Sequence, residues 1–177
     1  YLEEGKNFYK NYLKIGLSGA IGSVGLAIAM ISFIWSITNT TAAITLLCLA
    51  AMPFITALLG FLFLNEKISL GVWISIIIAA IGIIIMALSN DNTNSIGGLI
   101  FGLAAALGFS IFSVSLRWRK ETPKFTTVST AGLLCCLISA LVIINQDLNF
   151  LSTSKNQSLF ATHGALVCMG LILYSMG

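Results

Sequence analysis

The polar side chains that could do chemistry in this sequence stand singly within long apolar runs. His163 is the only histidine, and the acidic residues lie near the ends of those runs. An enzyme that works inside a membrane would need a nucleophile and a base at the same depth, such as a serine with a histidine or two facing carboxylates. The sequence shows neither arrangement, so we expect a protein that is not an enzyme.

Cysteine chemistry is not indicated either. The four cysteines all lie within apolar runs, and two of them are adjacent: Cys48, Cys135, Cys136 and Cys168. This spacing fits neither the paired ligands of a zinc site nor an extracellular disulfide framework. We therefore expect four small packing residues, no metal and no cofactor.

Isolated hydroxyl, amide and aromatic groups are the remaining candidates for a binding site. Polar groups within apolar helices need partners, and a water-filled cavity is one way to supply them. We predict that six such residues line a cavity for a small-molecule substrate: Trp35, Asn39, Thr45, Thr56, Ser110 and Tyr174. The spans hold no carboxylate, lysine or arginine at mid-depth, so proton coupling at the rim, exchange and facilitated diffusion all stay open.

The composition predicts an all-α polytopic membrane protein. Of the 177 residues, 58% are hydrophobic and 8% are charged, whereas soluble domains carry roughly 25% charged residues. The apolar runs are continuous, which excludes the alternating strands of a membrane barrel. Basic residues lie between the runs rather than in one patch, so we expect a lipid bilayer and no nucleic acid as partner.

Charged residues divide the chain into spans, because an ion in the middle of a bilayer is costly. The 51 uncharged residues between Lys14 and Glu66 are too many for one span, and the polar cluster from Ser36 to Thr41 is the place to divide them. A span needs about 20 residues. We expect six transmembrane helices, at residues 15–36, 41–64, 69–88, 96–116, 125–145 and 159–177.

The basic residues set the orientation of these spans. With a cytoplasmic N-terminal segment, eight of the nine lysines and arginines fall on the cytoplasmic side and only Lys155 falls outside. That distribution follows the positive-inside rule. We therefore expect a multi-pass protein of the cell (inner) membrane.

Several further residues are candidates for shaping or gating the bundle. Pro53 removes a helical hydrogen bond in the middle of the second span and predicts a bend, while Glu66 and Lys67 end that span in either a solvated turn or an interhelical ion pair. Small residues let membrane helices approach closely. Two such faces recur, and Gly22, Gly25 and Gly102 within them are candidate hinges: Gly16, Gly19, Gly22 and Gly25; Gly98, Gly102, Ala106 and Ser110.

A weak internal echo relates the first span to the last. The segments 19–26 and 164–171 share the pattern G-A-apolar, three residues, G-L. The two spans are five positions apart in order, an odd number, so matched copies would cross the membrane in opposite directions, as inverted transporter repeats do. The offset of 145 residues predicts a parent protein of ten helices.

The segment from Phe33 to Leu88 resembles the EamA-type transporters of the drug/metabolite transporter superfamily. Four features carry the resemblance: Thr40-Thr41-Ala42-Ala43, then AMPFITALLG at 51–60, then FLNEK at 63–67, and Gly82 within the next apolar run. The family pattern has a proline in its fourth helix, a glutamate-basic pair at the cytoplasmic end of that helix, and a glycine late in the fifth.

The resemblance implies a fold, a domain plan and a function. The chain would supply helices three to eight of a ten-helix bundle of two inverted five-helix repeats. Residues 1–90 would be the C-terminal part of the first repeat and residues 95–177 the N-terminal part of the second. Such a protein would be a secondary transporter that moves small organic metabolites by alternating access, as an exporter or exchanger. A second copy of the chain is a candidate partner. The alternatives are a non-transporting structural subunit and an intramembrane enzyme.

The predicted topology can be tested by labelling from one side of the membrane. Single cysteines placed at Asn94 and Asn156 should react with an impermeant thiol reagent from one compartment, and a cysteine at Lys120 only from the other, because an odd number of spans separates them. The measurement is reagent-accessible labelling in sealed, oriented vesicles. Labelling of all three from one compartment would contradict the six-span layout.

Overall fold

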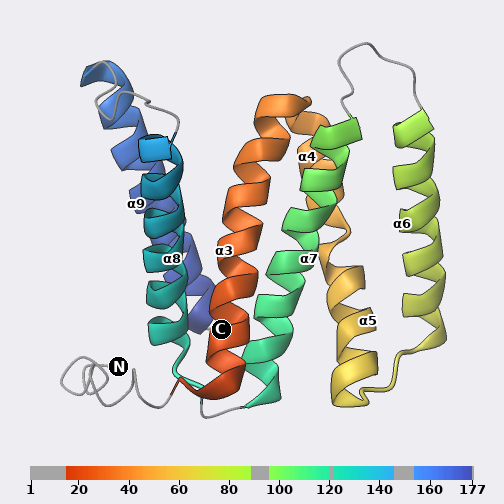
Figure 1. Ribbon diagram of the computed structural model, residues 1–177. Coiled ribbons are helices and arrows are strands. Elements are labelled where there is room, and N and C mark those ends of the chain that lie inside the picture. Colours follow the sequence, from red (N-terminus) through yellow and green to blue (C-terminus); the bar gives the residue numbers. More distant parts are fainter. Residues whose placement is uncertain (1–14, 89–95, 120–121, 146–153, 177) are drawn as a thin grey trace.

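The computed structural model describes residues 15–88, 96–119, 122–145 and 154–176, and these form helices with no strand among them. The helices are α3 (Gly16–Asn39), α4 (Ala42–Ala50), α5 (Met52–Leu64), α6 (Leu70–Leu88), α7 (Ile96–Trp118), α8 (Lys124–Asn145) and α9 (Ser154–Met176). They run up and down in one bundle (Figure 1). The prediction of an all-α polytopic fold is confirmed.

The predicted break between the first two spans lies where the polar cluster placed it. The helix α3 ends at Asn39, and Thr40 is extended, with φ −149°. Thr41 then caps α4, because its hydroxyl accepts a hydrogen bond from the backbone N–H of Ile44 at 3.4 Å. A threonine at this position satisfies one of the amide groups that a helix start leaves open.

The second predicted span is two helices rather than one bent helix. The helix α4 stops at Ala50, and α5 starts at Met52 with Pro53 in its first turn. Proline lacks the N–H that would continue the helical ladder but is well suited to the beginning of a helix. The correction has a simple cause: the chain restarts the helix at the proline instead of bending through it.

The pair α3 and α7 forms the centre of the bundle. Figure 1 shows the two helices side by side, with α8 and α9 beyond α3 and with α4, α5 and α6 beyond α7. The contacts agree, because α3 packs mainly on α7 and also on α8, while α4 and α5 pack on α7. Two helices that are far apart in sequence therefore make the main interface.

Glycines let the backbones of α3 and α7 touch. A Cβ atom built on Gly108 would lie 2.6 Å from the carbonyl oxygen of Gly25 and 2.9 Å from the backbone nitrogen of Ala29. A Cβ on Gly102 would lie 3.0 Å from Cys48 and from Ser36. The two small-residue faces predicted from the sequence are thus buried packing surfaces, with Gly16, at the exposed start of α3, as the exception.

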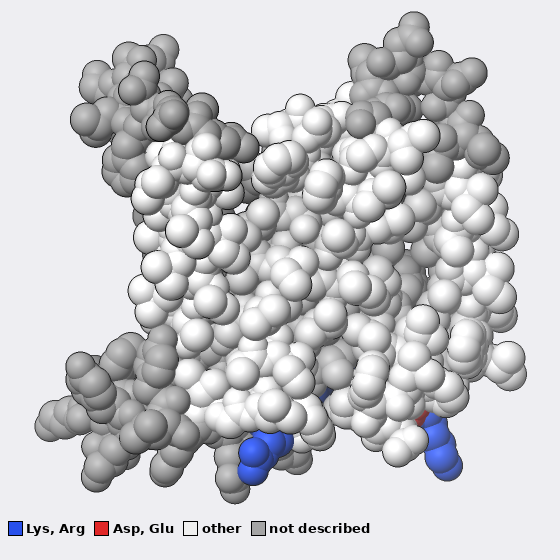
Figure 2. Space-filling model, viewed as in Figure 1, with Lys and Arg blue, Asp and Glu red and all other residues white. Residues whose placement is uncertain are grey.

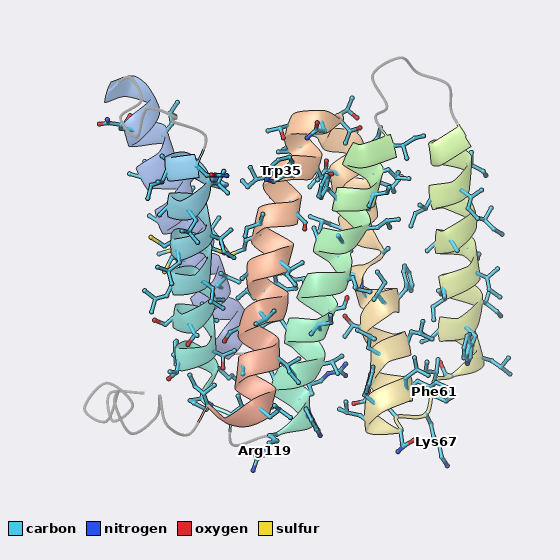
Figure 3. All side chains as sticks on the ribbon, in the orientation of Figure 1. Trp35, Phe61, Lys67 and Arg119 are labelled. Atoms are coloured by element: carbon cyan, nitrogen blue, oxygen red, sulfur yellow. The ribbon has the colours of Figure 1, made fainter. Side chains whose placement is uncertain are left out.

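Four of the described basic residues gather at one end of the bundle, whereas Lys155 lies in the first turn of α9 at the other end. Lys67 follows α5, Arg117 and Arg119 lie at the end of α7, and Lys124 begins α8. We call this the basic end. Figure 2 shows the visible Lys and Arg side chains along that edge and an uncharged surface above it, and Figure 3 places Trp35 toward the opposite end.

Four of the spans are long and apolar enough to cross a membrane by themselves: Gly16–Asn39, Ala42–Leu64, Ile96–Trp118 and Lys124–Asn145. The described apolar part of α6, Leu70–Ile85, is shorter. Many large apolar side chains face outward, as expected of surfaces that meet lipid or other helices.

The last helix differs from its predicted bounds. It begins at Ser154 rather than at residue 159, so His163 lies well inside α9 and not at its start. Polar residues at 154–158 made this first turn read as a loop, but hydroxyl and amide side chains are compatible with the first turns of a helix. In Figure 1, α3 and α9 run in opposite directions, which is the relation that an inverted repeat requires; the repeat itself stays a prediction.

We predict that Gly108→Ala destabilises the protein, because the added methyl group would collide with the backbone of α3. Overpacking of this kind costs about 1–3 kcal/mol. The measurement is thermal or denaturant unfolding in detergent. The control is Gly82→Ala in α6, where the added methyl meets nothing within 4 Å. Equal stabilities of the two variants would contradict the close contact of α3 and α7.

Candidate functional site

An apolar cavity of about 640 Å³ lies among α3, α4, α7, α8 and α9. We call it the apolar cavity. Its wall is made of small and aromatic side chains with very few polar atoms: Ala29, Met30, Phe33, Ile34, Leu49, Ala105, Phe109, Phe125, Val128, Ser129, Gly132, His163, Gly164, Val167, Cys168 and Leu171. Its volume is in the range of small-molecule sites, roughly 300–1,000 Å³.

The wall of the apolar cavity combines three phenylalanines with two hydrogen-bonding side chains. Phe33 comes from α3, Phe109 from α7 and Phe125 from α8, so three helices each supply an aromatic ring. Ser129 of α8 and His163 of α9 supply a hydroxyl group and an imidazole. The described lining includes no charged side chain. Such a wall can hold an apolar or aromatic molecule and make a few directed hydrogen bonds to it.

A second cavity of about 590 Å³ lies at the basic end, between α5, α6 and α7. We call it the polar cavity. It is lined by Met52, Pro53, Thr56, Ala57, Glu66, Lys67, Ile68, Ser69, Val72, Ser113 and Arg117. Three charged side chains and three hydroxyl groups therefore face one space, in contrast to the apolar cavity.

An ion pair crosses the polar cavity from the end of α5 to the end of α7. Arg117 Nη1 lies 3.2 Å from Glu66 Oε2 and 3.4 Å from Glu66 Oε1. Both side chains stay partly in solvent, with 43% of Arg117 and 42% of Glu66 exposed. This is the interhelical alternative that the sequence left open, but the partner of Glu66 is Arg117 and not a neighbour in sequence.

The comparison with known families matches residues 1–88 to the EamA-like transporter family. This half of the chain belongs to that family. No curated protein and no solved structure gave a match. The matched part ends at Leu88, the last residue of α6, so it covers α3 to α6 and one wall of each cavity.

Membership of the EamA-like family confirms the resemblance inferred from the segment 33–88. Together with the apolar helices, it supports a multi-pass membrane transporter. Because the family consists of transporters, it also supports the prediction that the protein is not an enzyme. Among the described residues, no group of three or more metal-ligating side chains occurs.

Thr56 is the predicted substrate-binding residue that lines one of the two cavities. It lies on the wall of the polar cavity together with Pro53, Glu66 and Lys67, which the sequence predicted as structural or gating residues. The EamA-like half thus brings four predicted residues to one place. Whether Thr56 contacts a substrate stays a prediction.

Thr45 and Ser110 are buried in helix contacts. The hydroxyl of Thr45 lies 2.9 Å from that of Ser36 and donates to the carbonyl of Thr41 at 3.3 Å. The hydroxyl of Ser110 lies 2.8 Å from the carbonyl of Ala106 and 3.1 Å from that of Met52. These partners satisfy both side chains within the protein, so neither needs a wet cavity.

Trp35 and Asn39 lie near the end of the bundle opposite the basic end. The Trp35 ring packs on Phe101 with centroids 5.6 Å apart, and the Asn39 amide donates to the carbonyl of Trp35 at 2.7 Å. Figure 3 shows Trp35 at the upper part of α3. Neither residue is in the lining of the two cavities. Tyr174 belongs to α9, and its side chain lies outside the described part.

The sequence analysis missed the aromatic wall of the apolar cavity and the cationic partner of Glu66. Phe33, Phe109 and Phe125 are ordinary residues in apolar spans, and no local pattern distinguishes them. Arg117 was assigned to topology alone, although a carboxylate and an arginine predicted at the same membrane face could have been paired. The signal was present in the topology, but several cations shared that face.

We predict that Thr45→Val lowers stability more than it changes transport, because it removes a buried hydroxyl pair rather than a substrate contact. Loss of one buried hydrogen bond costs on the order of 1 kcal/mol. The control is Thr38→Val, at an exposed site where the hydroxyl bonds only to its own helix. Unfolding and flux should be measured on both variants. A large rise in KM with unchanged stability would assign Thr45 to the substrate site instead.

Proposed function

We propose that the protein is a secondary transporter that moves small organic metabolites across the cytoplasmic membrane by alternating access, as an exporter or exchanger. Besides the family match, the main support for this proposal is the apolar cavity. Its wall takes residues from α3 and α4, which belong to the EamA-like half, and from α7, α8 and α9 of the other half. A site between two halves can open toward either side when the helices that surround it move.

The sequence did not identify the class of substrate, and the chemistry of the cavity wall favours one class. A charged group would lose its hydration here without an opposite charge to replace it, since the described lining has no charged side chain. The aromatic rings of Phe33, Phe109 and Phe125 instead offer flat packing surfaces to a substrate. We therefore infer a substrate with an aromatic or apolar body and a few hydrogen-bonding groups, for which Ser129 and His163 are the partners.

The orientation follows from the basic end. Lysine and arginine accumulate on the cytoplasmic side of membrane proteins, so we place Lys67, Arg117, Arg119 and Lys124 in the cytoplasm. The opposite directions of α3 and α9 support two inverted five-helix repeats, of which residues 1–90 and 95–177 would each be a part. In that arrangement the polar cavity opens toward the cytoplasm.

We predict that Gly132→Phe reduces substrate flux by filling the apolar cavity. Gly132 lies on the cavity wall, and a Cβ there meets nothing within 4 Å, so the added ring has room without disturbing the fold. The control is Gly82→Phe, at an equally open glycine on α6 that is not part of the lining. Flux of a panel of radiolabelled aromatic and aliphatic metabolites should be measured in proteoliposomes of the full-length protein.

The expected result is a several-fold lower flux of aromatic members in the Gly132 variant and normal flux in the Gly82 variant. Equal flux in both variants would exclude the apolar cavity as the substrate site. No flux of any member by the natural protein would favour the non-transporting structural subunit.

A further inference from the structure

The helix α5 is held more loosely than α4, from which it is separated at Ala51. In α4 the side chains of Ile44, Thr45 and Cys48 are buried against the bundle, whereas in α5 only Gly60 is buried. The helical ladder is interrupted between the two, because Pro53 has no N–H. The sequence therefore joins a firmly packed helix to a lightly packed one through a break that can act as a hinge.

Polar contacts join α5 to α7 near each end of α5. Near the hinge, the Ser110 hydroxyl lies 3.1 Å from the carbonyl oxygen of Met52, as well as 2.8 Å from that of Ala106 in its own helix. At the basic end, the Glu66 carboxylate contacts Arg117 at 3.2 Å. The polar cavity lies between the two contacts, with Thr56 of α5 and Ser113 of α7 in its wall. The contact of Glu66 with Arg117 lies farther from the hinge, so its release would let α5 move about the hinge.

The turn after α5 is shaped to present Glu66 to α7. Asn65 has a left-handed backbone, with φ 54°, which ends the helix and folds the chain back. The backbone N–H of Glu66 then donates to the carbonyl of Gly60 at 3.3 Å. A Cβ on Gly60 would lie 2.5 Å from Glu66 Oε2, so the carboxylate lies directly against the backbone of α5 at this glycine.

We propose that the pair of Glu66 and Arg117 is a releasable tie that holds α5 against α7, and that its release lets α5 swing about Ala51 to widen the polar cavity at the basic end. The pair is suited to release because both side chains are more than 40% exposed. Exposed ion pairs contribute little to stability and are weakened by salt. Lys67, on the same cavity wall, is a neighbouring cation and the natural control.

This inference rests on the proposed transport function for its purpose, but its test does not require transport. Spin labels are attached to cysteines at Phe63 and Trp118, exposed sites near the ends of α5 and α7. The background is the full-length protein with its other cysteines replaced. Pulsed electron-spin resonance in liposomes then reports the distance between the two helix ends.

We expect Glu66→Gln and Arg117→Gln each to shift the distance distribution to longer values, as should high salt in the unsubstituted protein. The charge-swapped double variant, E66R with R117E, should restore the shorter distance. Lys67→Gln should leave the distribution unchanged. High salt needs no substitution at the pair, so the proposal stays testable if a single variant fails to fold.

The tie is overturned if neither single variant nor high salt changes the distribution, or if Lys67→Gln changes it as much as Glu66→Gln does. A swapped variant that stays as open as the single variants would also count against it. Flux is measured on the same samples. A distance change without flux in any sample would leave the tie standing and remove the transport function, so the two failures are distinguishable.

Discussion

The close approach of α3 and α7 is the contact on which the rest of the bundle depends. Apolar side chains gain nothing in lipid by meeting one another, so helices associate where their backbones can come near. Gly25 and Gly108 supply that nearness, and no side chain separates the two helices there. The pair then offers two outer faces: α8 packs on the side of α3, and α4 and α5 pack on the side of α7.

Packing becomes looser with distance from this central pair. In the most apolar stretch of each span, 44% of the residues are buried in α3 and in α7, against 17% in Ala42–Leu64 and 11% in α8. A rigid centre with lightly held helices around it suits a protein whose outer helices must move while the fold persists. The break at Ala51 divides the span Ala42–Leu64 along the same line, because α4 buries Ile44, Thr45 and Cys48 whereas α5 buries only Gly60.

The two cavities lie on opposite sides of the central pair and differ in chemistry. The apolar cavity presents aromatic rings and the imidazole of His163, whereas the polar cavity presents Glu66, Lys67 and Arg117 at the basic end. Charged groups are expected where water reaches them, and the described charged side chains at these cavities belong to the polar one. This separation is compatible with both proposals, a substrate site in the apolar cavity and a tie between α5 and α7, because neither places an ion within the hydrocarbon.

Local physics is enough to explain what the sequence determined by itself. The cost of an ion in hydrocarbon marks span ends, a threonine pair marks the break at Thr40, and glycines at helical spacing mark the close contact. Which residues of different helices contact one another was decided only by the tertiary structure. Helices that are apolar on every side do not encode which face turns inward, so the burial of Thr45 and Ser110 and the meeting of three phenylalanines were not predictable. Glu66 and Arg117 are 51 residues apart in sequence, and they form an ion pair because the fold brings the ends of α5 and α7 together.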